Sequence, residues 1–471
     1  MSNLFSDIST VPLKKFTKKD RGSISVFLVL ILFLVIGFLF ALLESVRFQS
    51  AHYAMREASD AAMDSVLAGY QRELFEKYGL MFYDGSFGGG PLRTEMIEEE
   101  FALWFEKNAD GSLLRLTSDR IHLNSVKTAA DYNGFFFMES AVRYELLLEE
   151  AENGSIEHAL SLENDRKSLL LRIRNLENLW ASLPDPGQEL SEDASETDAW
   201  KLIQEANRLR ADSFRAVLKN DRPLSGTELP RQELPSVSFR DERIPEEGDG
   251  LMLTGTLTEE EKTALFHSYL GKYFPCYTDA QDEAGLFLEA EYLIFGQMTD
   301  EMNLRAAVSA LLRIREAVNA EAIRSSAEEQ RQIRALSEEY REAAGQDDRI
   351  EEKLLRACAF TKAVAETAFL LHGGELPFEA GAEAFSYRDY LEAHLLELDP
   401  ADLSYRGLDM IQENLRRYGS DFLAGSLVYE MDFTVDARMD ALFTRQAVFM
   451  NGLGKNPLSK SFSQRTSGSY R

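Results

Sequence analysis

The chain contains little cysteine and little histidine, with two Cys and six His among 471 residues. Two cysteines, Cys276 and Cys358, do not make a disulfide framework; they leave open either one disulfide or two separate buried thiols. No two histidines have the spacing of helical metal ligands, and no nucleophile elbow or phosphate-binding loop occurs. We therefore predict no catalytic residue, no cofactor site and no metal site, and we expect a protein that is not an enzyme.

Acidic residues outnumber basic ones outside the N-terminus. Residues 1–21 carry five basic and two acidic residues, a balance of +3, whereas the whole chain carries −28, so the remainder carries −31. A part this acidic repels nucleic acid and anionic lipid headgroups. We therefore expect no nucleic-acid partner.

What the chain does have is one long apolar run, VFLVLILFLVIGFLFALL at residues 26–43. As a helix these eighteen residues would reach about 27 Å, enough to cross the hydrocarbon core of a bilayer. A buried core helix and a cleaved secretory signal are the alternatives, but the apolar core of a signal usually spans only about 7–15 residues before a small-x-small cleavage site. The sequence predicts a transmembrane helix over residues 22–44.

The residues that flank this run predict its orientation. Five basic residues precede it, and Glu44 is the first charged residue after it. Because positive residues are retained on the cytoplasmic side, we expect a single-pass protein of the cell membrane with a cytoplasmic N-terminus and its bulk outside.

The helix should continue beyond the membrane as a stalk. No proline occurs between Ser45 and Tyr78. Within this stretch small residues recur at spacings of three and four, which lets another helix approach closely. The partner could be a later helix of this chain or a neighbouring subunit in a helix-mediated oligomer. The predicted seam consists of Ala51, Ala54, Ala58, Ala61, Ser65 and Ala68.

The remaining pattern is mostly helical, with a minor strand component in 112–131 and 426–435. We expect a mainly α fold with a minor β component (α+β), in which a transmembrane helix and stalk precede a helical outer domain with a small sheet. The predicted organisation is a basic cytoplasmic tail (1–21), the transmembrane helix (22–44), the stalk helix (45–80), an α+β segment (81–183), a Pro-rich acidic linker region with a central helix (184–250), a mainly helical domain with a C-terminal hairpin (251–450) and a disordered tail (451–471).

The N-terminal motif KKDRGSISVF at residues 18–27, followed by the apolar run, resembles type IV pilin-like proteins, specifically the pseudopilin-like TadE and TadG components of Tad (tight adherence) pilus systems. Residues 58–70, 73–82, 291–296 and 386–391 are also similar to an uncharacterised family of Gram-positive bacteria that is found near Tad-like secretion genes. The resemblance implies prepilin-type processing between Gly22 and Ser23.

One departure from the pilin pattern bears on function. Typical pilins have a glutamate at the fifth position after the cleavage site, where this chain has Phe27. The resemblance therefore implies a minor pseudopilin-like or assembly component, with the lipid bilayer and other pilus or secretion-system proteins as partners. A membrane-anchored extracytoplasmic hydrolase and a sensor or receptor ectodomain remain the alternatives.

Overall fold

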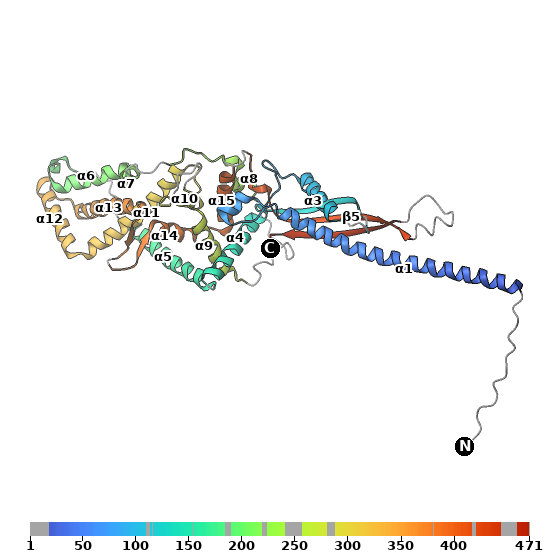
Figure 1. Cartoon of the computed structure of the whole chain (residues 1–471). Coiled ribbons are helices and arrows are strands. Elements are labelled where there is room, and N and C mark those ends of the chain that lie inside the picture. Colours follow the sequence, from blue (N-terminus) through green and yellow to red (C-terminus); the bar gives the residue numbers. More distant parts are fainter. Residues whose placement is uncertain are drawn as a thin grey trace, which may run out of the picture. The chain divides into compact units, whose positions relative to one another are not determined.

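The computed structural model describes residues 18–109, 114, 116–153, 155–183, 190–218, 224–240, 257–279, 288–379, 381–416, 421–443 and 459–470. The fold is mostly helical with small antiparallel sheets and one long N-terminal apolar helix (Figure 1), which confirms the predicted α+β class. The side chains of 18–23 are not described.

The elements follow one another in a simple order. The helices are α1 Lys18–Leu67, α2 Arg72–Tyr78, α3 Thr94–Ala109, α4 Asp131–Glu152, α5 Glu157–Ser182, α6 Asp198–Ala211, α7 Ser213–Val217, α8 Pro235–Ser238, α9 Glu259–Tyr273, α10 Glu289–Phe295, α11 Asp300–Ser325, α12 Ala327–Ala344, α13 Ile350–Leu371, α14 Tyr387–Leu395 and α15 Pro400–Leu415. The strands are β1 Tyr83–Asp84, β2 Thr117–Thr128, β3 Glu375–Pro377, β4 Ala384–Ser386, β5 Leu427–Asp440 and β6 Ser459–Ser469. In the larger sheet β5 lies between β1 and β2 and also pairs with β6, while β3 and β4 form a small antiparallel pair.

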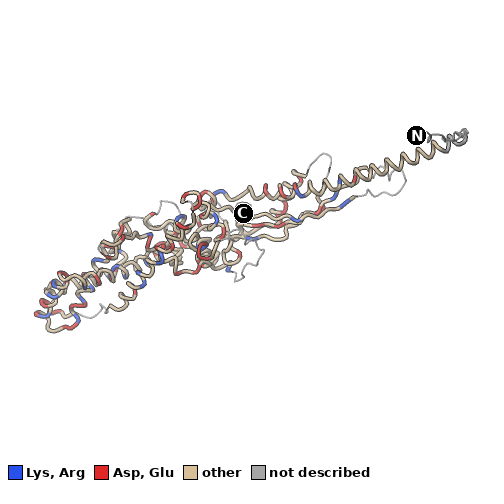
Figure 2. Tube along the Cα trace, turned by 90° about the horizontal axis from the view of Figure 1, so that it is seen from below, with Lys and Arg blue, Asp and Glu red and all other residues tan. Residues whose placement is uncertain are grey.

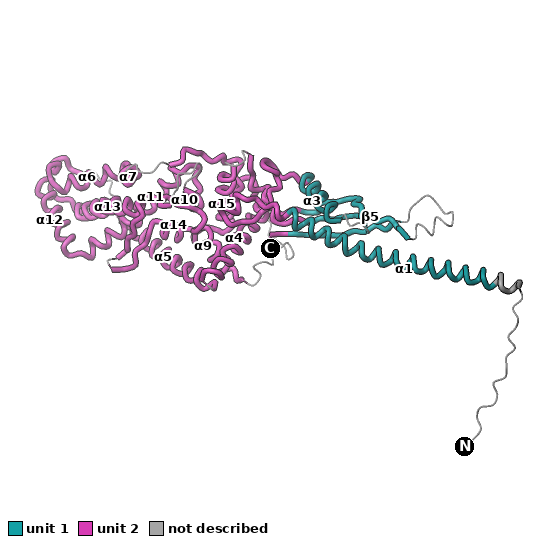
Figure 3. Tube along the Cα trace, in the orientation of Figure 1, with its two compact units in different colours: residues 1–66, 95–125, 432–468 teal, residues 67–94, 126–431, 469–471 magenta. Residues whose placement is uncertain are grey.

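The chain forms two compact units that interleave in sequence (Figure 3). Unit 1 comprises residues 1–66, 95–125 and 432–468, and unit 2 comprises 67–94, 126–431 and 469–471. The expected linear succession of segments therefore does not describe how the chain is partitioned.

Unit 1 places α1 and α3 against a sheet. Phe101 of α3 stacks on Phe433 of β5 with ring centroids 4.1 Å apart, and Phe48 of α1 contacts Phe462 of β6. Arg465 of β6 forms an ion pair with Asp432 of β5. Because successive strand side chains alternate between faces, this pair lies on the face opposite to Phe433 and Phe462. Both helices therefore contact the same, apolar face of the sheet.

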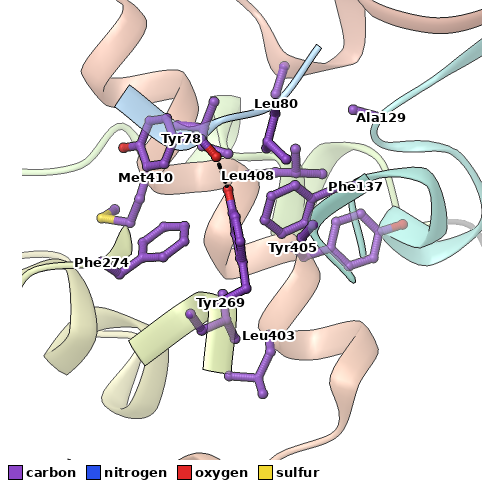
Figure 4. Packing of buried hydrophobic residues seen from close by; sticks show 14 of the residues in the cluster. Tyr78, Leu80, Ala129, Phe137, Tyr269, Phe274, Leu403, Tyr405, Leu408 and Met410 are labelled. Atoms are coloured by element: carbon purple, nitrogen blue, oxygen red, sulfur yellow. Dashed lines mark hydrogen bonds between the residues drawn. The ribbon is translucent and has the colours of Figure 1, made fainter. Parts of the chain in front are cut away.

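Unit 2 is built around helix-to-helix cores. In the first, the Tyr269 hydroxyl donates to the backbone oxygen of Tyr78 at 2.8 Å, and Phe137, Phe274 and Leu408 pack around the two rings (Figure 4). A second core joins α5, α11, α13 and α14, and a third joins α6, α12 and α13. Packing of these apolar faces is what stabilises the helices, because short isolated helices are marginal in water.

The predicted stalk is not one continuous helix. Helix α1 ends at Leu67, and α2 begins at Arg72. Gln71 caps the N-terminus of α2, because its side chain accepts a hydrogen bond from Leu74 N. Gly79 then ends α2 in the left-handed conformation at φ 68°, a conformation that glycine adopts without strain. The 45–80 segment is thus two helices.

The C-terminal prediction is corrected by the structure. Residues 459–469, predicted as part of a disordered tail, form strand β6. No hairpin closes within 427–443, since β5 is one strand of fourteen residues and the next strand among the described residues is β6. The polar composition of β6 fits an edge position with one covered face, where alternate residues alone need be buried.

Several other predicted segments lie where expected. The central helix of 184–250 is α6. In the mainly helical domain predicted from residue 251 onward, α9 begins with a capping box between Thr258 and Glu261. Residues 1–17, 184–189, 241–250 and 451–458, on which the predictions of the tail and linkers also fall, lie outside the described residues.

Candidate membrane-anchor site

Helix α1 is long and apolar enough to cross a membrane, and it is the one such helix among the described residues. Its apolar window is not buried by other parts of the chain. Figure 2 shows this stretch as tube without Lys, Arg, Asp or Glu. A helix that exposes leucine and phenylalanine on all sides suits a lipid environment better than water.

One stripe of α1 is nevertheless covered, and it begins inside the apolar run. Ile36 and Phe40 are half-buried while their neighbours are exposed, and Glu44 is buried. The stripe continues at spacings of three and four along the helix, as expected for a single helical face. Its further members are Phe48, Ala51, Met55, Ala58, Ala62 and Val66.

Glu44 is the polar centre of this stripe and is only 3% exposed. Its carboxylate accepts hydrogen bonds from Leu442 N at 3.1 Å and from Phe443 N at 2.7 Å, and Arg47 donates to it at 3.1 Å. Arg47 also donates to the backbone oxygen of Asp440 at 2.8 Å. The carboxylate and the guanidinium together hold the end of β5 against α1, as buried charges require hydrogen-bonded partners.

Aromatic contacts continue on both sides of Glu44. One turn toward the N-terminus, Phe40 stacks on Phe443 with centroids 6.0 Å apart. One turn toward the C-terminus, Phe48 contacts Phe462, and the Lys460 ammonium lies 5.4 Å from the Phe48 ring centroid. Thr466 of β6 donates to Asp60 at 2.9 Å. Within unit 1, therefore, β6 and the end of β5 cover the stripe.

The predicted seam residues occupy graded positions on this surface. Ala51 and Ala58 are fully buried, whereas Ala54, Ala61 and Ser65 are half-buried, and Ala68 is exposed beyond the end of α1. The Ser65 hydroxyl donates back to Ala61 O in its own helix. The buried line is rotated slightly from the predicted one, toward Met55 and Ala62. Gly22 and Ser23, the predicted processing residues, lie within α1.

Sequence reasoning missed the partners of this helix. Phe462 is a single aromatic residue among polar neighbours, and Phe443 follows directly on Ala441 and Leu442 without a helical or strand repeat, so no periodic pattern marked either of them. Glu44 is identifiable in the sequence as the first charged residue after the apolar run. One feature of the sequence indicates that it is buried: it lies on the same helical face as Phe40, Phe48 and Ala51.

The two cysteines of unit 2 are also candidate reactive groups. Cys276 and Cys358 are both free thiols. Burial raises the pKa of the Cys276 thiol to about 11, which keeps it protonated and unreactive at neutral pH. Among the described residues no three His, Cys, Asp or Glu side chains gather in a way that could hold a metal ion.

One hollow in unit 2 has a volume of about 700 Å³ and lies against α5 and α11. Its lining combines Arg172, Glu321 and Glu379 with apolar Leu176 and Val318, without histidine or cysteine. A smaller one of about 220 Å³ is lined by Arg324, Arg334 and Arg356 together with Glu351 and Glu352. These side chains offer salt-bridging groups and no nucleophile paired with a base.

Helix α10 carries two buried carboxylates in unit 2. Glu289 accepts from Lys77 Nζ at 3.1 Å and from Asn414 at 2.8 Å. Glu291 accepts from the Tyr387 hydroxyl at 2.7 Å and from Tyr277 N at 2.8 Å. Burial raises the pKa of both carboxyls, that of Glu291 to about 7. Each group links α10 to separate segments of the chain, so the pair serves to hold unit 2 together.

Comparison with known proteins gives one match. Residues 191–380 match the model of a family of unknown function, DUF5702. No curated protein and no solved structure matches the chain. The matched segment runs from just before α6 to just after β3, so it includes the α11 to α13 helices of unit 2 and leaves out the apolar helix.

Proposed function

We propose that this chain is a non-enzymatic, single-pass membrane protein that acts as a minor pseudopilin-like or assembly component of a Tad-like pilus or secretion system. The observation that supports it best is the construction of α1, whose first half is apolar and exposed and whose second half is packed into unit 1. This combination of membrane helix and stalk in one element is the arrangement that the resemblance of residues 18–43 to TadE- and TadG-like proteins implies.

The orientation in this proposal follows from charge. The five basic residues of 1–21 hold the N-terminus in the cytoplasm, and both units beyond Glu44 lie outside. The acidic outer part then works by contact with other pilus or secretion-system proteins.

A minor or assembly role fits better than that of a bulk filament subunit. The glutamate that aligns neighbouring pilins is replaced by Phe27, whose side chain is exposed on α1. In addition, the small-residue seam at Ala51 and Ala58 is covered by this chain itself, which favours the intramolecular partner over a neighbouring subunit. Contact with another membrane helix would use the exposed apolar residues of 24–43.

A gene deletion followed by electron microscopy of the cells tests this proposal. Deleting the gene in the producing bacterium should abolish or shorten surface pili in electron micrographs, and a full-length copy should restore them. A copy in which a cleavable secretory signal replaces residues 1–44 should be exported but should fail to restore pili. Normal pili in the deletion strain would refute the proposal, and a secretion ATPase gene beside this one would support it.

A further inference from the structure

The contact between Phe40 and Phe443 links the folded part of unit 1 to membrane depth. Phe40 lies within the apolar run, four residues before Glu44, which corresponds to about 6 Å along a helix. The Phe443 ring is 6.0 Å from it, centroid to centroid, in a stacked arrangement. If α1 spans a bilayer with residues 26–43 in its hydrocarbon core, Phe443 lies at the level of the outer edge of that core.

The neighbouring residue, Leu442, shows the same character. Its side chain, two residues after the end of β5, is 47% exposed. The backbone N–H groups of Leu442 and Phe443 are both bonded to Glu44, so these two donors carry no unmet hydrogen-bonding need into an apolar medium. An N–H group that enters the edge of a membrane needs such an acceptor, because an unbonded N–H there costs several kcal/mol.

Cationic side chains lie at the next level along α1. Arg47 donates to Asp440 O, and the exposed Lys460 lies over the rings of Phe48 and Phe462. Phe48 is five residues beyond Leu43, so this level is about 7 Å from the end of the apolar run, where the headgroups begin. Lysine with its stem on apolar surface and its ammonium at the headgroups is a common interfacial arrangement.

We infer that the segment directly after β5, residues 441–443, is a second membrane contact of this chain, in which Leu442 and Phe443 enter the extracytoplasmic leaflet beside α1. Arg47 and Lys460 lie at the headgroup level above them. The occupant of this apolar surface is the lipid bilayer, because the surface is continuous with the exposed apolar face of the membrane helix. The inference rests on the membrane anchor of the proposed function and not on its pilus role.

The consequence is mechanical. A helix that only spans the bilayer can rotate about its axis, whereas two adjoining membrane contacts fix the orientation of unit 1 toward the membrane. Residues 441–443 would therefore act as a second point of attachment to the membrane beside α1.

Depth measurements on the full-length protein in nanodiscs test this inference. In a Cys276→Ser/Cys358→Ser background, spin labels are placed at Leu442→Cys, at Phe33→Cys in the apolar run and at Arg438→Cys, an exposed position of β5. We expect the ratio of oxygen to nickel-chelate accessibility at residue 442 to be several-fold higher than at 438 and to approach that at 33. A Leu442→Trp variant should likewise be quenched by brominated acyl chains more strongly than the parent chain.

The labels at 33 and 442 distinguish a failure of the second membrane contact from a failure of the membrane anchor. A label at 442 that is as accessible to the nickel chelate as the one at 438, while 33 remains lipid-like, would overturn the second contact and leave the anchor intact. A water-like label at 33 would overturn the anchor and this inference together. Neither result affects the gene-deletion test, which alone decides the pilus role.

Discussion

The Glu44 carboxylate and the backbone N–H of Phe443, 399 residues apart in sequence, are joined by a hydrogen bond of 2.7 Å. The bond connects the first charged residue after the apolar run to the segment that directly follows β5. With Leu442 N and Arg47 as its other donors, Glu44 makes a closed polar group on an otherwise apolar stripe of α1. Its loss should free the end of the strand.

Replacing Glu44 by alanine is therefore expected to destabilise unit 1. The change leaves two amides without their acceptor, at a cost of about 1–3 kcal/mol. Hydrogen exchange of the 442–443 amides should accelerate, while Glu44→Gln, which keeps one acceptor oxygen, should have a smaller effect. Glu57→Ala, at an exposed position of the same helix, is the control. Equal exchange in Glu44→Ala and Glu57→Ala would show that the carboxylate does not hold the strand.

The seam makes a graded prediction. Ala58→Leu should overpack a site that is 3% exposed and cost about 1–3 kcal/mol. Ala61→Leu, at a half-buried position, should cost less, and Ala68→Leu, at an exposed position past the helix end, should cost almost nothing. Thermal unfolding in detergent gives the three melting temperatures. The same loss at all three sites would contradict the burial pattern described above.

The sequence predicts the α+β class and the apolar helix because both rest on long periodic signals. It did not predict β6, because alternate polar residues in SKSFSQRTSGS give no apolar repeat, and the strand depends on β5 and α1 for its burial. The break after Leu67 was likewise missed, since Ala68 favours a helix and Gly69 opposes one only weakly.

Of the candidate site, the sequence predicts the buried face of α1 but not the residues that cover it. Spacing identified the stalk face to within one residue, as Ala51 and Ala58 are buried. It could not identify Phe443 or Phe462, because contacts between residues hundreds of positions apart leave no mark in a single sequence. Nor could it show that the covered face extends down to Phe40, within the apolar run.

Glu291 predicts a pH dependence of stability in unit 2. Burial raises its pKa from 4.5 to about 7 in the folded protein, although hydrogen bonds from Tyr387 and Tyr277 oppose this. The folded state thus binds the proton more tightly than the unfolded state. This contribution to stability is fully present below about pH 4.5 and is lost as the pH rises to about 7.

The test compares unfolding at pH 5 and pH 7.5. At about 1.4 kcal/mol per pKa unit, Glu291 should contribute on the order of 3 kcal/mol to the difference. Glu291→Gln, which does not titrate, should flatten the profile in this window, whereas Glu338→Gln at an exposed position of α12 should leave it unchanged. An unaltered profile in Glu291→Gln would mean that this carboxyl does not titrate in the folded state as described.

The membrane topology makes the last prediction. Protease added to intact cells after removal of the wall should digest the part beyond Glu44 and leave a small N-terminal fragment protected by the bilayer. In the proposed topology the basic residues of 1–21 set the orientation, so a variant with Lys14, Lys15, Lys18, Lys19 and Arg21 all changed to Gln should lose the uniform digestion pattern. Mass spectrometry of the same fragment reads its N-terminus: Ser23 would show prepilin-type processing after Gly22, and Met1 would show an uncleaved anchor. A mature protein beginning beyond residue 50 would instead identify the apolar run as a cleaved signal and would remove the anchor, because Phe40 and Glu44 would then be absent from the exported chain.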